Sequence, residues 1–458
     1  MSFRIERDSM GELKVPSDKL WGAQTQRSYE NFKIGNDGDK MPREIIDAFA
    51  ILKMAAARAN RVLLPDKMTE EKLSLIEKAA GAILCGELYD NFPLAVFQTG
   101  SGTQTNMNAN EVIAAYGNRE IGKTVLHPND DVNMSQSSND TFPTAMHIAA
   151  YLALKSSLIP ELDLLITELS RLEKENVDAV KCGRTHLQDA TPISFAQEIS
   201  GWSASLVRAK SMILKASESL LYIALGGTAV GTGLNAPLGF DTLVAEKISE
   251  ITSYPFKTDE NKYHALTSKS ELVFTHGAIR ALAADLMKIA NDVRWLASGP
   301  RCGLSEITIP ENEPGSSIMP GKVNPTQCEA VTMVAVEVMG NDTAIGVAAS
   351  QGNFELNVFM PVIINNFLRS VRLLSDVICS FREKCVSGIK ANRKKMKENL
   401  NSSLMLVTAL NPYIGYENGA KTAKLAYSEG ITLKEACLRL GFLTEEEFDR
   451  VFHPEKMI

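Results

Sequence analysis

A long, regular spacing of apolar residues between positions 268 and 298 constrains the fold of this chain more than any other feature. The apolar positions are separated by multiples of about 3.5 residues, a period typical of a seam between packed helices. At 1.5 Å per residue this helix would be roughly 45 Å long. The positions that carry the pattern are Leu272, Ile279, Leu282, Leu286, Ile289, Val293 and Leu296.

Similar patterns fill much of the remaining chain. Few segments alternate apolar and polar residues as strands do, so we expect a mostly α protein built on an unusually long helix bundle. The first 40 residues are polar and predict irregular structure, and the tail after about position 364 predicts short helices. The further helical runs are 43–64, 69–91, 143–173, 192–224 and 326–350.

Composition argues against several classes of protein. The chain has 458 residues, 45% of them hydrophobic, and a formal net charge of −7, which disfavours nucleic acid or an anionic membrane as the main partner. Seven cysteines without a C-x-x-C pair indicate reduced thiols in a cytosol-like compartment. The first residues carry charges of both signs, so we expect neither a secretory signal nor a transit peptide. We also expect no membrane span, because no window holds 18 uncharged apolar residues.

Four polar segments interrupt the helical runs and hold the candidate functional residues. Each places Ser, Thr, Asn or Asp just before a helix, where such residues are good N-caps. Capping would explain any one of them alone, whereas four large segments together indicate a binding site. They are patch one, TGSGTQTNMNANE (99–111); patch two, HPNDDVNMSQSSND (127–140); patch three, CGRTHLQDATP (182–192); and patch four, GSSIMPGKVNPTQCEA (315–330).

Patch four predicts a site for an anion. Asn324 as N-cap, Pro325 at the first helical position and Gln327 at the third predict a capping box with a proline start. A helix N-terminus offers free N–H groups and partial positive charge, and Lys322 adds a full charge beside it. The expected guest is a carboxylate or a phosphate. Glycines bracket the two serines, so we expect a loop that closes over the guest.

Patch three carries His186, one of six histidines. A lone histidine is more often structural than catalytic, but this one lies in a polar segment beside Arg184. A carboxylate such as Glu329 would orient the imidazole and raise its pKa. Patches two and three flank the run 143–173, some 40 Å apart if Pro160 does not bend it. If they share a site, they come from different subunits of an obligate oligomer.

Two further patterns predict no cofactor. The run GGTAVGTG (226–233) follows a helical pattern rather than a strand and lacks G-x-G-x-x-G spacing, so we expect no dinucleotide or phosphate-binding loop. Cys182 and His186 have i,i+4 spacing, but no other ligands cluster near them in the sequence. We therefore expect no zinc site.

The patches also resemble a known family. Patch four resembles the signature loop of the fumarase/aspartase superfamily, and nearly the whole chain is similar to class II, iron-independent fumarate hydratases. The resemblance implies three largely helical domains, 1–136, 137–363 and 364–458, whose central long-helix bundle forms a twenty-helix core in a homotetramer. The motifs that carry it are DSMGELKVPSDKLWGAQTQRS, SGTQTNMNANEV, HPNDDVNMSQSSND, GRTHLQDATP, GGTAVGTGLN and KVNPTQCEA.

The same resemblance implies an activity. It implies reversible hydration of fumarate to (S)-malate, as in the tricarboxylic acid cycle, through a carbanion with aci-carboxylate character. The resemblance also implies active sites that are shared by three subunits and use no metal or cofactor. A proton next to a carboxylate is weakly acidic, so the carbanion needs concentrated positive charge and N–H donors. With no nucleic-acid or membrane partner expected, the location would be cytoplasmic, or the mitochondrial matrix only if a transit peptide has been removed.

Residue roles follow from the resemblance. Ser316 resembles the base that takes the C3 proton of malate, and Lys322 and Asn324 resemble binders of the carboxylate whose charge grows. His186, backed by Glu329, resembles the group that handles the water. The implied substrate binders are Ser101, Gly102, Thr103, Ser137, Ser138, Asn139, Thr185, Ser317, Lys322, Val323 and Asn324. The family's second, non-catalytic dicarboxylate site is matched by His127, Pro128, Asn129 and Asp130.

Two alternatives stay open. Aspartate ammonia-lyase shares the fold, although residues 101–104, 127–128, 137–140 and Gly321 favour fumarase. A catalytically inert structural member, such as a lens crystallin, would not need Ser316. One departure from the family concerns the second site, because a basic residue expected just before His127 is not clearly placed and Lys123 is the nearest candidate.

Overall fold

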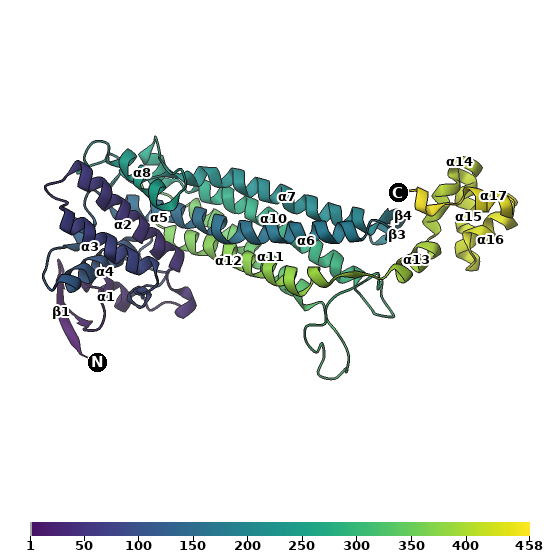
Figure 1. Ribbon diagram of the computed structural model, residues 1–458, viewed down its shortest axis with the longest axis horizontal. Helices are drawn as coiled ribbons and strands as arrows, with labels where there is room; N and C mark the ends of the chain where they lie inside the picture. The colour runs from purple at the N-terminus through teal and green to yellow at the C-terminus, as the bar shows by residue number, and fades with distance from the viewer. Residues whose placement is uncertain (1) are drawn as a thin grey trace. The chain divides into compact units, whose positions relative to one another are not determined.

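The computed structural model describes residues 2–458 and contains two units, whose elements are labelled in Figure 1. Unit 1 comprises Met1–Pro160, Ser211–Ala281 and Val336–Leu374. Unit 2 comprises Glu161–Lys210, Leu282–Ala335 and Ser375–Ile458. The predicted domains 1–136, 137–363 and 364–458 stay a prediction.

Long helices dominate, as the apolar spacing predicts. The predicted helices 268–298 and 326–350 are α10 (Ser270–Leu296) and α11 (Thr326–Ala349). The mostly α prediction is therefore confirmed. The other long helices are α2 (Arg43–Leu63), α4 (Thr103–Ile121), α5 (Ser138–Ala153), α6 (Ile159–Glu175), α7 (Phe195–Ser217) and α12 (Met360–Lys384).

Several helix boundaries differ from the prediction for local reasons. The run predicted at 69–91 ends early, as α3 (Glu70–Leu84), and Gly86 follows it with a φ of +87°, a conformation that suits glycine after a helix. The helical run continues from Ser138 to Glu175 through a π-helical turn, Leu154–Leu158, and Pro160 follows directly after that turn without ending the run. The tail predicted as short helices from 364 begins instead inside the long α12.

Unit 1 opens with a β-hairpin where irregular structure was predicted. Strands β1 (Phe3–Asp8) and β2 (Gly11–Pro16) pair antiparallel, and α1 (Ala23–Asn31) follows. The strands are mostly exposed or half-buried, so they lack the apolar face from which a strand is predicted. The backbone N–H groups of Gly22 and Gln24 donate to Glu111 of α4 at 2.8 and 3.0 Å, which joins this segment to the helices.

Helix α2 lies at the centre of unit 1. It packs against α3, α4, α5 and α8 (Phe240–Thr252), and its alanine-rich faces allow these helices to approach closely. The remaining elements of this unit are β5 (Tyr222–Ile223), β6 (Lys257–Thr258) and α9 (Lys262–Thr267).

Unit 2 contains a hairpin where patch three predicted a loop. Strands β3 (Val180–Thr185) and β4 (Gln188–Ser194) pair antiparallel around a two-residue turn, His186–Leu187. The buried Cys182 of β3 belongs to the hydrophobic core of the C-terminal helices, which are yellow in Figure 1. The other elements are β7 (Ile307–Thr308), β8 (Lys390–Ala391), α13 (Arg393–Ser402), α14 (Asn411–Ile414), α15 (Tyr416–Glu429), α16 (Leu433–Arg439) and α17 (Glu445–Val451).

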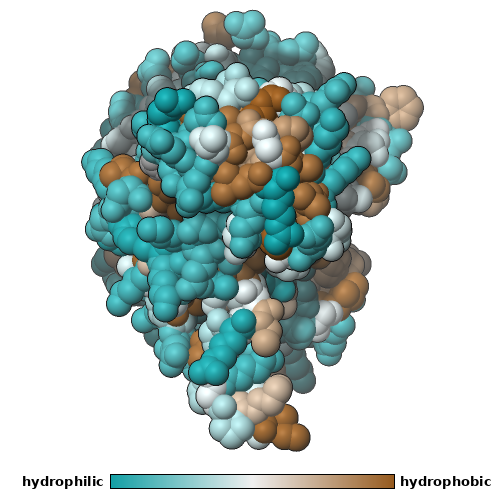
Figure 2. Space-filling view, turned by 90° about the vertical axis from the view of Figure 1, so that its right-hand side faces the viewer, coloured by the Kyte–Doolittle hydropathy of each residue, from teal (hydrophilic) through white to brown (hydrophobic). Residues whose placement is uncertain are grey.

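The surface of the chain carries apolar side chains in several places. Figure 2 shows one face, on which hydrophobic residues gather among polar ones in its upper part. Helix α11 exposes Met333, Val336 and Val347 at 67%, 61% and 60%. In residues 2–458, α11 alone is long and apolar enough to cross a membrane by length and composition, and 28% of its most apolar window is buried. One such helix is weak support for a span, since helices covered by other helices share its composition.

Candidate functional site

Patch one forms the N-terminus of α4. Gly102 is the N-cap with a φ of +72°, and a Cβ there would lie 2.0 Å from the Phe142 ring. Only glycine fits this left-handed, crowded position. Ser101 and Thr103 share a hydrogen bond of 2.9 Å between their hydroxyls. The three predicted binders of patch one therefore lie together at one helix terminus.

Patch two forms the N-terminus of α5, where a capping box is present. Ser137 is the N-cap, and its backbone N–H donates to Asp140 at 2.9 Å. The other Asp140 oxygen accepts from the N–H groups of Gly226 and Thr228 at 3.0 and 2.8 Å. Burial raises the pKa of Asp140 to about 6. The run 226–233 thus donates two backbone N–H groups to a carboxylate of its own chain.

A fully buried cation lies behind patches one and two. The Lys53 ammonium of α2 donates to the side-chain oxygens of Asn106, Asn133 and Gln136 at 2.7, 3.0 and 2.9 Å. Asn106 in turn donates its Nδ2 to the Ser138 hydroxyl at 3.1 Å. Asn139 donates to the Ala229 carbonyl at 2.8 Å. Each of these helix-start residues is thus held by a hydrogen bond: Ser137 to Asp140, Ser138 from Asn106, and Asn139 to Ala229.

The predicted second site lines a separate pocket of unit 1. His127, Pro128 and Asn129 line a pocket of about 630 Å³ together with Arg7 of β1, whereas the Asp130 side chain is 82% exposed. The backbone N–H of Asp130 donates to His127 Nδ1 at 3.2 Å. Lys123, the predicted basic residue, forms an ion pair with Glu71 at 2.7 Å.

Patch four is a tight loop in unit 2. The Gly315 N–H donates to the Lys322 carbonyl at 2.8 Å, and a Cβ on Gly315 would lie 2.4 Å from that same oxygen. The half-buried Ser316 accepts hydrogen bonds from the N–H groups of Ile318 and Met319 at 3.2 and 3.0 Å. Ser317 is exposed. The loop therefore holds the Ser316 oxygen against two backbone donors.

The predicted capping box of patch four is replaced by other contacts. Asn324 donates its Nδ2 to the Gly315 carbonyl at 2.6 Å, which closes the loop. The Gln327 oxygen that a capping box would direct at Asn324 accepts from the Ser380 hydroxyl at 2.7 Å. The side chains of Asn324 and Gln327 bond to Gly315 and Ser380 instead of to each other's backbone. The local sequence pattern therefore did not predict their partners.

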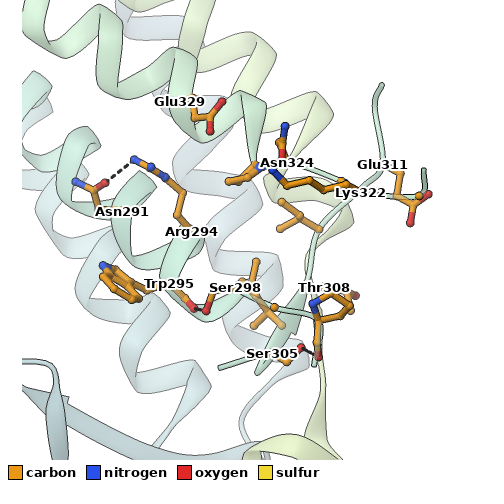
Figure 3. A pocket seen from close by; sticks show the side chains of 18 residues that line it. Asn291, Arg294, Trp295, Ser298, Ser305, Thr308, Glu311, Lys322, Asn324 and Glu329 are labelled. Carbon is orange, nitrogen blue, oxygen red and sulfur yellow. Dashed lines mark hydrogen bonds between the residues drawn. The ribbon is translucent and has the colours of Figure 1, made fainter. Parts of the chain in front are cut away.

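A pocket of about 630 Å³ lies where patch four meets α10 (Figure 3). Lys322, Val323, Asn324 and Glu329 line it. Sequence reasoning missed the side from α10, where Arg294 donates to Asn291 at 3.2 Å. Two cations, Lys322 and Arg294, and two carboxylates, Glu311 and Glu329, line the pocket. Lys322 and Arg294 are the groups in this lining that an anionic guest would contact.

His186 and Thr185 lie at the exposed tip of the β3–β4 hairpin. His186 and Leu187 have φ values of +57° and +59°, the conformation of the turns that join strands through two residues. In residues 2–458 of one chain, His186 forms no hydrogen bond or ion pair with Glu329. The predicted partnership of these two side chains therefore does not occur within one chain.

The base of this hairpin is held by a buried carboxylate. Glu306 is fully buried and accepts from Arg184 at 2.7 and 3.0 Å, and it lies 3.3 Å from the Lys181 ammonium. Asn399 of α13 adds a bond of 3.1 Å. Burial acts to raise the pKa of Glu306, but Arg184 and Lys181 outweigh it and hold the pKa below its usual value.

The predicted site residues thus form two sets. Unit 1 brings together Ser101, Gly102, Thr103, Ser137, Ser138 and Asn139, with His127, Pro128 and Asn129 in their own pocket. Unit 2 contains Ser316, Ser317, Lys322, Val323, Asn324 and Glu329, and also the hairpin with Thr185 and His186.

Comparison with known proteins gives full-length matches. Residues 11–340 match the family described as Lyase, and residues 406–458 match that described as Fumarase C C-terminus. The chain is 61% identical to fumarate hydratase class II of Bacillus subtilis over 462 residues, which span 100% of this chain and 99% of the relative. It is 60% identical to that of Helicobacter pylori over 463 residues, with the same coverage.

Solved structures give the same result. The class II fumarase from Schistosoma mansoni matches with a TM-score of 0.97 and 41% identity, covering 100% of this chain and 99% of that one. A fumarate lyase:delta crystallin from Brucella melitensis bound to cobalt matches with a TM-score of 0.94 and 38% identity, over 100% and 99%.

The Glu306 cluster predicts an acid-sensitive fold. Because the folded pKa lies below the unfolded value of about 4.3, the stabilisation is present above that value and is lost as the pH falls through the folded pKa. Glu306→Gln should remove this part of the pH dependence, measured by urea unfolding between pH 3 and 7. Glu246→Gln, on the exposed face of α8, is the control. Equal pH dependence in both variants would contradict the role of Glu306.

Proposed function

The chain belongs to the class II fumarate hydratases, and we propose that it catalyses the reversible hydration of fumarate to (S)-malate, as expected in the tricarboxylic acid cycle. It is a lyase of the fumarase fold. The observation that carries the proposal is the loop that holds Ser316 beside Lys322 and Asn324, in a chain 61% identical to a fumarate hydratase over its full length. The expected substrate is a small dicarboxylate.

Ser316 is the proposed base for the C3 proton of malate. A serine is a poor base unless its alkoxide is stabilised. The N–H groups of Ile318 and Met319 donate to its oxygen, and hydrogen bonds to the charged form lower a pKa. The hydrogen bond from the Gly315 N–H to the Lys322 carbonyl closes the loop and keeps the lysine in the same loop as Ser316. These contacts favour the alkoxide form of Ser316. A chain that did not use Ser316 as a base would not need them.

The remaining groups receive the charge and the water. Once the C3–H bond breaks, negative charge moves onto the adjacent carboxylate, as an aci-carboxylate. Lys322 and Asn324 would bind that carboxylate, because cations and N–H donors stabilise developing charge. His186, oriented by Glu329, would give its proton to the C2 hydroxyl, which then leaves as water. In the hydration direction each proton moves the opposite way.

The active site is proposed to assemble from three copies in a homotetramer. Three different chains would each contribute one part. These parts are the substrate binders of patches one and two, the hairpin with Thr185 and His186, and patch four with Glu329. The lack of a His186–Glu329 contact within one chain supports this arrangement. So does α11, because its exposed Met333, Val336 and Val347 need a cover. A twenty-helix core of four copies would supply one.

The second dicarboxylate site is proposed for the pocket of His127, Pro128 and Asn129. Arg7 lines that pocket and is the better candidate for its cation than Lys123, which is paired with Glu71. Asp130 contributes its backbone at the helix start rather than a buried side chain. We also propose a cytoplasmic location, in keeping with the bacterial relatives, and no nucleic-acid or membrane partner.

The first experiment follows double-bond absorbance of the purified, chelator-treated protein with malate and aspartate offered separately. Absorbance should rise with malate and not with aspartate. A rise with aspartate alone would identify an ammonia-lyase instead. No rise with either substrate would favour the inert structural member.

Ser316→Ala should lower turnover by about a hundredfold or more, because general-base catalysis contributes roughly that much. Steady-state malate dehydration measures it, and the exposed Ser428→Ala in α15 is the matched control. Turnover equal to the control would refute the role of Ser316.

Mixing Ser316→Ala with Ser138→Ala chains, followed by reassembly, should restore activity if sites are composite, and it should not if each chain holds a whole site.

His127→Asn should leave turnover near that of the unchanged protein while weakening dicarboxylate binding to the second pocket. The reason is that the pocket lined by His127 does not include the proposed substrate binders Ser101, Ser138 and Asn139. Turnover and equilibrium binding of malate would be measured on the same preparation. Abolished turnover would show that this pocket takes part in catalysis.

A further inference from the structure

We propose that Lys53 is a positioning residue for the substrate-binding group of unit 1, joining patch one to patch two and placing a positive charge behind Ser138. The inference rests on the proposed function, in which Ser138 binds a substrate carboxylate. It adds a residue of α2 that lies in none of the four patches.

The contacts of Lys53 indicate an ammonium ion rather than a neutral amine. An ammonium has three protons to donate, and three side-chain oxygens accept from it, those of Asn106, Asn133 and Gln136. Asn106 belongs to patch one, and the other two belong to patch two. One buried group therefore fixes both segments relative to each other.

A chain of hydrogen bonds leads from this charge to the substrate binder. Asn106 accepts from Lys53 through Oδ1 and donates through Nδ2 to the Ser138 oxygen at 3.1 Å. Because that oxygen accepts from Asn106, the Ser138 proton is free to point toward a carboxylate. Hydrogen bonds in such a chain polarise one another, so the Lys53 charge strengthens Ser138 as a donor.

The charge of Lys53 is costly in this place, which argues that it has a use. Its side chain is fully buried, and burial lowers its pKa to about 7. Of the helices packed against α2, α5 supplies the charged group that acts on it, Asp140. Asp140 is held by three backbone N–H groups and also faces Lys262 of α9. A neutral amide network could tie the patches together without such a charge.

A second buried lysine provides the contrast. Lys269 is also buried, and burial lowers its pKa to about 7. Its ammonium donates to the backbone carbonyls of Ala265, Leu266 and Ser268 at the end of α9. A cation at the last carbonyls of a helix has a structural explanation. Lys269 is therefore the matched control for a buried lysine without a link to the patches.

The test compares Lys53→Gln with Lys269→Gln in the assembled protein. The measurements are KM and kcat for malate and the inhibition constant of succinate, a dicarboxylate that cannot react, from pH 6 to 8.5. Lys53→Gln should raise KM and the succinate constant by at least about tenfold, as expected for a lost charge-assisted contact, with a smaller change in kcat. Lys269→Gln should leave both constants unchanged even if it lowers the melting temperature.

The pH profile separates positioning from simple structural support. Protonated Lys53 favours an anion, so the succinate constant of the unchanged protein should rise as the pH increases through about 7. In Lys53→Gln this rise should disappear. Gln136→Glu puts a carboxylate against the ammonium, so the rise should move to higher pH. This variant carries the test if Lys53→Gln fails to fold, and an unmoved profile would overturn the proposal.

Ser138→Ala distinguishes failure of the inference from failure of the proposed function. If Ser138→Ala raises the succinate constant and folded Lys53→Gln does not, the inference is wrong and the proposed site stands. If Ser138→Ala changes nothing, the proposed binding group is wrong, and the role of Lys53 falls with it.

Discussion

A buried charge must be paired or fully hydrogen-bonded, and both halves of the candidate site depend on this constraint. In unit 1, Lys53 and Asp140 are buried and satisfied by polar groups from segments distant in sequence. In unit 2, Glu306 plays the same part for the hairpin of His186. Breaking such a cluster by removing one partner typically costs about 3–5 kcal/mol. The residues proposed to meet substrate are therefore positioned by buried charged residues that are not proposed to touch it.

The sequence predicts the long helices and the residues of the patches well, because both rest on local patterns. The period of apolar residues at 268–298 is a property of one helix, and Ser137 caps α5 through its immediate neighbours. The β3–β4 hairpin is less predictable, since its turn is His-Leu rather than the Asn-Gly that signals such turns. Asn324 is similar, because its partner is the Gly315 carbonyl at the other end of a loop.

Lys53 and Glu306 were missed for a related reason. Each is a single charged residue in a short stretch of uncharged ones, and a charge alone does not tell whether its side chain is buried. A lone lysine within AILKMAAARAN, on an otherwise apolar helix face, is the one signal that pointed inward. Its three acceptors lie more than fifty residues away along the chain, so only the folded structure joins them.

The His186–Leu187 turn has a consequence for how firmly the imidazole is held. Two consecutive non-glycine residues with positive φ store roughly 1–3 kcal/mol each of backbone strain. That energy favours relaxation of the tip. The ion pairs that Arg184 and Lys181 of the same strand form with Glu306 oppose this relaxation. The hairpin therefore holds backbone strain at its tip. If the contacts of Glu306 at its base were lost, the tip could relax and the His186 imidazole would change position. Local order at Glu306 then determines how steadily the tip presents the His186 side chain.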